Sequence, residues 1–233
     1  MPKLVLLPGM DGTGDLFGDF IAALPSSFET VTARYPPDKS LTFRELQELV
    51  RAICPDTGPL VVLYASGNSI RSNETANLQG LVLCAGFATS PVLGWKRWIV
   101  SLTAPLFLSR ALPQSAIRTF LLDRGSPPHL VEQVRQAISS VNAAVLSQRL
   151  GDILACDVQT ELAGVKVPIL YIRGNQDRIV GLSSLKTIQA IKSRTSVLAL
   201  DAPHLLLQQE PRKSADAVMS FINRHGAPEQ RKF

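Results

Sequence analysis

The chain has 233 residues, of which 45% are hydrophobic and 18% are charged. This composition can fill a sizeable apolar core and argues against an intrinsically disordered chain. Lys and Arg number 24 against 19 Asp and Glu, a net charge of +5, but the cations are dispersed along the chain. Nucleic-acid-binding proteins normally gather cations in a stripe with interleaved aromatic residues, so we expect no nucleic-acid partner.

The first apolar run, at the N-terminus, is too short for a secretion signal. The longest apolar run, residues 98–108, is too short to span a bilayer, so we expect no transmembrane segment. Three cysteines, Cys54, Cys84 and Cys156, form an odd count without the spacing of a zinc site. Neither a disulfide framework nor a metal site is therefore expected, and this cysteine usage is typical of a cytoplasmic protein.

Short apolar runs without alternation recur along the chain and predict strands that are buried on both faces, as in a parallel sheet. Helical patterns separate several of these runs, and the second helix opens with a Thr42-Phe-Arg-Glu45 capping box. Strands that alternate with helices predict a mostly parallel, doubly wound α/β sheet. The predicted strands are residues 4–7, 30–33, 60–64, 81–84, 169–172 and 196–200, and the predicted helices are residues 16–24, 42–53, 185–191 and 215–222.

One long segment breaks this alternation. The residues between Cys84 and Val167 have helical periodicity and little strand signal, and Pro105, Pro113, Pro127 and Pro128 divide them into short helices. We interpret residues 86–164 as a helical cap inserted into a core made of residues 1–85 and 165–233. The very apolar part at 95–108 fits either packing onto this core or a lid over a pocket.

Polar residues follow several predicted strands, at the edge where a parallel α/β sheet binds its ligands. A glycine-rich loop that contains Met10 follows the first strand, and Ser66 follows the third. Asp177 and His204 follow the last two strands. Serine, aspartate and histidine therefore occur in that order, each in a loop at the same edge of the predicted sheet.

In these stretches the sequence resembles the α/β-hydrolase superfamily, in particular its cap-bearing esterase and lipase-like members. The resemblance extends from residue 4 to about residue 223. It rests on Leu-Leu-Pro-Gly at residues 6–9, on Gly174-Asn-Gln-Asp177-Arg-Ile-Val180 and on Asp201-Ala-Pro-His204-Leu-Leu-Leu. It implies the α/β-hydrolase fold and a serine hydrolase that cleaves a carboxylic ester or thioester with a hydrophobic group.

The resemblance also implies a role for individual residues. Ser66 would attack the substrate carbonyl, His204 would take up and return the proton, and Asp177 would orient the imidazole. The backbone N–H groups of Met10 and Gly67 would bind the developing oxyanion. This chemistry needs no metal and no organic cofactor, and its partner is a small hydrophobic ester. Acyl transfer to an alcohol would use the same residues.

The nucleophile stretch departs from the Gly-x-Ser-x-Gly pattern of the family. Tyr64 and Asn68 occupy the positions of the two small residues around Ser66. A second register places Ser69 in the pattern but leaves Arg71 at its last position. The segment before the next strand is also shorter than in a typical member. Three hypotheses stay open: Ser66 as nucleophile, Ser69 as nucleophile, or no working nucleophile, for example because residues are missing around this turn.

Two other functions stay open. A non-catalytic protein of the same fold would bind a small apolar molecule under the cap, and the altered nucleophile stretch would explain its lost turnover. A nucleotide-dependent oxidoreductase would use Gly9, Gly12 and Gly14 after the first strand, with Arg34 placed to bind a 2′-phosphate. The glycine spacing differs from that of dinucleotide-binding proteins, so the serine hydrolase is the leading hypothesis. The sequence does not indicate an oligomeric state.

Overall fold

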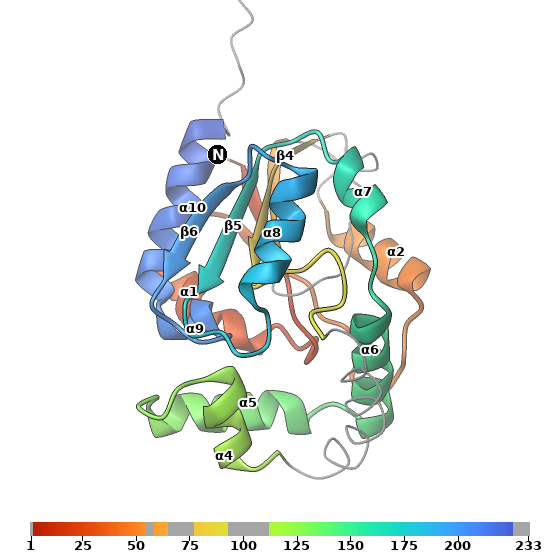
Figure 1. Cartoon of the computed structure of the whole chain (residues 1–233), viewed down its shortest axis with the longest axis vertical. Helices are drawn as coiled ribbons and strands as arrows, with labels where there is room; N and C mark the ends of the chain where they lie inside the picture. The colour runs from red at the N-terminus through yellow and green to blue at the C-terminus, as the bar shows by residue number, and fades with distance from the viewer. Residues whose placement is uncertain (1, 55–57, 65–76, 93–111, 226–233) are drawn as a thin grey trace, which may run out of the picture.

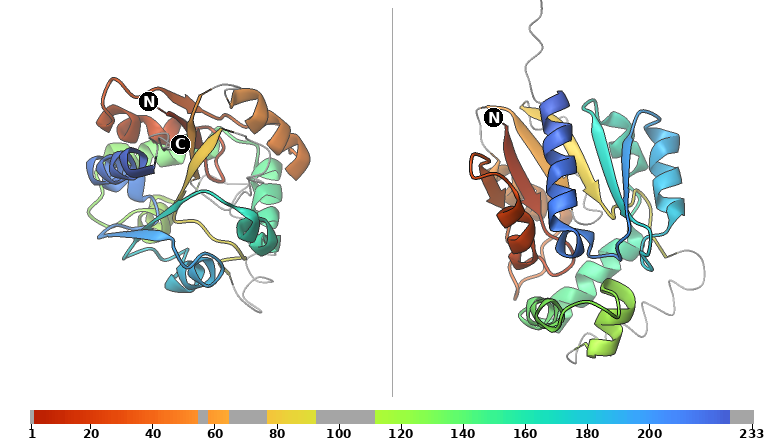
Figure 2. Two further views of the ribbon diagram at one scale, coloured as in Figure 1. Left: turned by 90° about the horizontal axis from the view of Figure 1, so that it is seen from above. Right: turned by 90° about the vertical axis from the view of Figure 1, so that its left-hand side faces the viewer.

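The computed structural model describes residues 2–54, 58–64, 77–92 and 112–225. These residues form a central six-stranded sheet with helices on both faces (Figures 1 and 2). All neighbouring strands are parallel, in the order β2-β1-β3-β4-β5-β6, which confirms the predicted α/β sheet. The strands are β1 (Lys3–Leu7), β2 (Thr30–Thr32), β3 (Leu60–Tyr64), β4 (Leu78–Cys84), β5 (Ile169–Gly174) and β6 (Ser196–Leu200).

Helices cover both faces of the sheet. Those on one face are η1 (Asp15–Phe17), α1 (Gly18–Ala23), α9 (Leu206–Gln209) and α10 (Pro211–His225), and those on the other are α2 (Phe43–Ile53), α7 (Gln159–Gly164) and α8 (Leu182–Ile191). In Figure 1, α10 lies on the opposite side of the sheet from α2. The predicted helix at 16–24 is thus a 3-10 turn followed by a short α-helix, and α8 begins three residues earlier than predicted.

Residues of the four inner strands, β1, β3, β4 and β5, feed two separate cores on the two faces of the sheet. Leu4 and Leu6 pack with the helices α1 and α10, whereas Val5 and Leu7 pack with α2 and α8. All four side chains are at most 1% exposed. This double burial explains why the strand sequences are continuously apolar rather than alternating.

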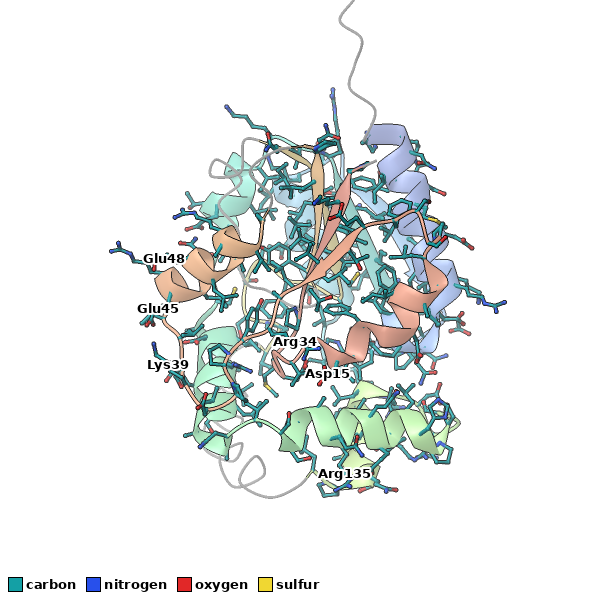
Figure 3. All side chains as sticks on the ribbon, turned by 180° about the vertical axis from the view of Figure 1, so that it is seen from behind. Asp15, Arg34, Lys39, Glu45, Glu48 and Arg135 are labelled. Carbon is teal, nitrogen blue, oxygen red and sulfur yellow. The ribbon has the colours of Figure 1, made fainter. Side chains whose placement is uncertain are left out.

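The N-terminus of α2 forms the capping box that the sequence predicts. The Thr42 hydroxyl accepts a hydrogen bond from the Glu45 N–H at 3.3 Å, and the Glu45 carboxylate accepts one from the Thr42 N–H at 2.8 Å. Lys39 lies 3.1 Å from the same carboxylate (Figure 3). The hydrogen bond from the Thr42 backbone, together with these neighbours, lowers the pKa of Glu45 to about 2.

The segment between β4 and β5 is helical over most of its described length. Its helices are α4 (Gln114–Ala116), the π-helical turn η3 (Ile117–Leu121), α5 (Pro128–Ser139), α6 (Ala143–Ala155) and α7. In Figure 1, α4 and α5 lie beyond the edge of the sheet toward which β5 and β6 point. The last helix, α7, instead packs beside the sheet against α8. No helix in the described part of the chain is both long and apolar enough to cross a membrane.

Candidate active site

The strand order places a switch point at the middle of the sheet. The chain passes from β1 to β2 on one side and then returns to β3 on the other side of β1. Open parallel sheets bind ligands outside the carboxyl ends of the strands at such a point. The loop after β1, residues 8–14, lies at this edge, together with the loops that follow β5 and β6.

Asp177 and His204 meet at this edge, although 27 residues separate them. Asp177 follows β5, His204 follows β6, and His204 Nδ1 lies 2.9 Å from Asp177 Oδ2. The other carboxylate oxygen, Oδ1, accepts hydrogen bonds from the N–H groups of Ile179 at 2.8 Å and Val180 at 2.9 Å. The side chain of Asp177 is 2% exposed and that of His204 is 15% exposed.

These contacts define what the pair can do chemically. Both oxygens of Asp177 are engaged: Oδ2 contacts the imidazole and Oδ1 accepts hydrogen bonds from two backbone amides, so the carboxylate is held in one orientation. A carboxylate beside Nδ1 favours the imidazole tautomer with the proton on Nδ1. The Nε2 atom of His204 is then left as an acceptor, which is the arrangement of a general base.

The loops that carry the pair are joined through their backbones. Asn175 N–H donates to Leu200 O at 2.8 Å, and Gln176 N–H donates to Ala202 O at 3.1 Å. Gly174, the last residue of β5, lies so close to the second loop that a Cβ atom there would be 2.3 Å from Ala202 O. A residue without a side chain is therefore required at this position.

The loop after β1 is a compact turn. Gly12 N–H donates to Gly9 O at 3.1 Å, and the Asp11 carboxylate accepts hydrogen bonds from both the N–H and the hydroxyl of Thr13. Asp11 thus acts as a turn residue. No described residue accepts a hydrogen bond from the N–H of Met10.

An apolar cavity of about 300 Å³ lies between this edge of the sheet and the helices beyond it. Met10 and His204 both line it, as does the buried thiol of Cys84, whose pKa is raised by burial. The opposite wall comes from the segment between β4 and β5. Its side chains include Leu121, Val134, Ile138, Leu150, Ile153 and Leu154.

Several of the residues considered in the sequence lie outside the described residues. They are Ser66 and Ser69, Gly67, and the apolar stretch at 95–108. Among the described residues, no group of three or more His, Cys, Asp or Glu side chains is arranged to hold a metal ion. Arg34, considered for a phosphate, forms an ion pair with Asp15 at 2.8 Å (Figure 3).

Arg149 contacts the same edge of the sheet and was not among the residues selected from the sequence. It projects from α6, and its guanidinium donates hydrogen bonds to the carbonyl oxygens of Met10, Asp11 and Pro36. Burial lowers its pKa. An arginine within a helical pattern carries no sequence signal for a partner about 140 residues earlier, so only the fold could identify it.

Comparisons of sequence give no relative. No protein-family model matches the chain. No curated protein matches it either.

Solved structures match it closely in fold. A bromoperoxidase from Bacillus anthracis superimposes with a TM-score of 0.79 and 12% identity, over 96% of this chain and 92% of the other. A thermophilic esterase from Thermogutta terrifontis gives 0.77 and 17%, over 96% and 90%. An enol-lactonase from Burkholderia xenovorans gives 0.74 and 16%, over 95% and 91%. These structures and the parallel sheet together show that this protein has the α/β-hydrolase fold.

Proposed function

We propose that this protein is a serine hydrolase that cleaves a small carboxylic ester or thioester with a hydrophobic group. The observation that carries the proposal is the hydrogen bond between Asp177 and His204 beside an apolar cavity at the carboxyl edge of the sheet. The carboxylate that contacts the imidazole is buried and is itself fixed by two backbone amides, an arrangement that suits a residue that orients a general base. The names of two similar structures, an esterase and an enol-lactonase, agree with this chemistry.

In the proposed reaction, Ser66 Oγ attacks the carbonyl carbon while His204 Nε2 takes up the hydroxyl proton. Asp177 stabilises the imidazolium that forms, and the N–H groups of Met10 and Gly67 bind the oxyanion. The tetrahedral intermediate expels the alcohol or thiol, which takes the proton from His204. Water then attacks the acyl-enzyme by the same route and releases the carboxylic acid.

Residues 86–164 would act as a cap that supplies the apolar wall of the substrate site, on a core made of residues 1–85 and 165–233. The side chains from η3, α5 and α6 that line the cavity support this role. A cavity of about 300 Å³ is at the small end of the range for ligand sites, which is roughly 300–1,000 Å³. We therefore expect short acyl chains to be preferred over long ones.

Steady-state hydrolysis of p-nitrophenyl acetate, butyrate, octanoate and palmitate by the full chain tests this proposal. The native protein is expected to turn over the short esters, and His204→Gln is expected to abolish turnover. His129→Gln is the matched control, since His129 is exposed on α5 and should leave the rate unchanged. Equal rates in the native protein and His204→Gln would overturn the proposal. Added ethanol tests whether the acyl group also passes to an alcohol.

A further inference from the structure

Arg149 connects three segments that are far apart in the sequence. One nitrogen of its guanidinium, Nη1, lies 3.0 Å from Met10 O and 2.7 Å from Asp11 O, and Nη2 lies 2.9 Å from Pro36 O. The guanidinium carbon lies 5.7 Å from the centre of the Tyr35 ring. A residue of α6 thus holds the loop after β1 and the chain after β2 at once.

We infer that Arg149 is a positioning residue that orients the Met10 N–H toward the oxyanion of the substrate. This inference rests on the proposed function, in which Met10 supplies one oxyanion donor. It assigns Arg149 a part in the chemical step, beyond attaching α6 to the rest of the molecule.

The path of the backbone explains how Arg149 acts on the Met10 N–H. Gly9 O accepts the Gly12 N–H and therefore points into the turn. In a trans peptide the N–H and C=O point in opposite directions, so the Met10 N–H points out of the turn. Arg149 binds the carbonyls of the next two peptides, which link residues 10 to 12. It thereby holds the segment over which the Gly12-to-Gly9 hydrogen bond closes, and that hydrogen bond orients the peptide that carries the Met10 N–H. A donor fixed in advance needs no reorganisation when charge develops.

The charge of Arg149 favours the same reaction. Arginine stays protonated in proteins, and the described carboxylates include none that forms an ion pair with Arg149 within 4 Å. The Asp11 carboxylate accepts hydrogen bonds from the N–H and the hydroxyl of Thr13. Among the described residues, no carboxylate lies within ion-pair distance of the partly buried Arg149 cation, although the Asp11 charge acts on it from further away. The cation lies beside the loop, where its field favours negative charge that forms at the Met10 N–H.

Gly12 shows that the loop and the guanidinium fit closely. Its φ is +69°, and a Cβ atom at this position would lie 2.5 Å from Arg149 Nη1. Any side chain at position 12 would both strain the turn and displace the guanidinium. The loop conformation and the position of Arg149 are therefore mutually dependent.

The test compares Arg149→Met, which removes the charge and the donors, with Arg149→Lys, which keeps the charge and one donor group. Arg135→Met is the matched control, because Arg135 lies on α5 (Figure 3) and pairs with Glu132. For each protein we measure kcat and KM for p-nitrophenyl butyrate, hydrogen–deuterium exchange of the peptide that covers residues 8–14, and the melting temperature.

For Arg149→Met we expect kcat to fall about 10- to 100-fold, because complete removal of one oxyanion donor lowers kcat by about 100-fold or more. KM should stay within twofold of the native value. Exchange of the loop peptide should become faster. The kcat of Arg149→Lys should be at least threefold higher than that of Arg149→Met. Arg135→Met should match the native protein in kcat, KM and loop exchange. A native kcat and native loop exchange in Arg149→Met would overturn the inference, as would a loss of melting temperature with kcat unchanged.

The two proposals fail in different ways. If the native protein hydrolyses no ester, the proposed function fails, and loop exchange in the two Arg149 variants alone decides whether Arg149 orders the loop. If the native protein is active and Arg149→Met does not fold, Arg149→Gln, which also removes the charge, takes its place: native kcat and native loop exchange in Arg149→Gln would overturn the inference.

Discussion

Replacement of Gly174 by alanine tests whether the Asp177–His204 pair depends on the close packing of two loops. The new Cβ would lie 2.3 Å from Ala202 O and 2.5 Å from Pro203 O. A carbon and a carbonyl oxygen approach to about 3.3 Å at closest, so the loops must separate by about 1 Å. The Asp177–His204 distance of 2.9 Å would then exceed the range of a hydrogen bond.

We expect Gly174→Ala to lower kcat for a short ester at least about 100-fold, because a displacement of this size in a catalytic group has such an effect. The overpacked contact should also reduce the free energy of unfolding by about 1–3 kcal/mol. Gly151→Ala is the control: Gly151 lies on α6 with no atom within 4 Å of an added Cβ. Alanine there should stabilise the helix by about 0.5–1 kcal/mol.

The measurements are steady-state kinetics and urea unfolding of both variants beside the native protein. A Gly174→Ala protein with native kcat and native stability would refute the reasoning, because the two loops would then not require their close approach. A loss of stability with native kcat would show that the loops yield elsewhere and that the pair does not depend on Gly174.

Three further predictions concern Asp177, Glu45 and Cys156. Asp177→Asn should lower kcat about 10⁴-fold with little change in KM, since the wrong imidazole tautomer is favoured; a reduction below tenfold in steady-state assays would contradict this. In the folded protein the pKa of Glu45 is about 2, below the ordinary value of 4.5. The contribution of Glu45 to the stability of the folded state is therefore complete above pH 4.5 and is lost as the pH falls toward 2. Glu45→Gln should therefore lower the melting temperature at pH 7 and less at pH 3; an equal difference at both would refute this. Burial and nearby acids raise the pKa of Cys156 to about 11, so iodoacetamide at pH 8 should modify it far more slowly in the folded than in the unfolded protein, as mass spectrometry can measure.

The architecture could be predicted from the sequence because it depends on local patterns. A strand that is buried on both faces must be apolar throughout, as Leu4 to Leu7 are, and such runs identified the four inner strands. The edge strands β2 and β6 were also predicted, although they are partly exposed. The capping box at Thr42 and Glu45 likewise depends on residues three apart. Asp177 and His204 could be brought together because both follow strands of one parallel sheet.

The remaining contacts depend on distances that no local pattern contains. Arg149 reaches the loop at Met10 across about 140 residues, and its partners are carbonyl oxygens, which every residue has. The close approach of Gly174 to Ala202 is equally a property of the assembled loops. The 3-10 turn that precedes α1 follows from the positive φ of Gly14, which the sequence pattern does not reveal.

The central claim, that a serine is activated by His204, is tested most directly by a fluorophosphonate probe and mass spectrometry of the labelled peptides. One adduct is expected, on Ser66, that is absent from His204→Gln and retained in His129→Gln. A folded native protein that acquires no serine adduct, yet binds a small apolar ligand reversibly, would contradict it.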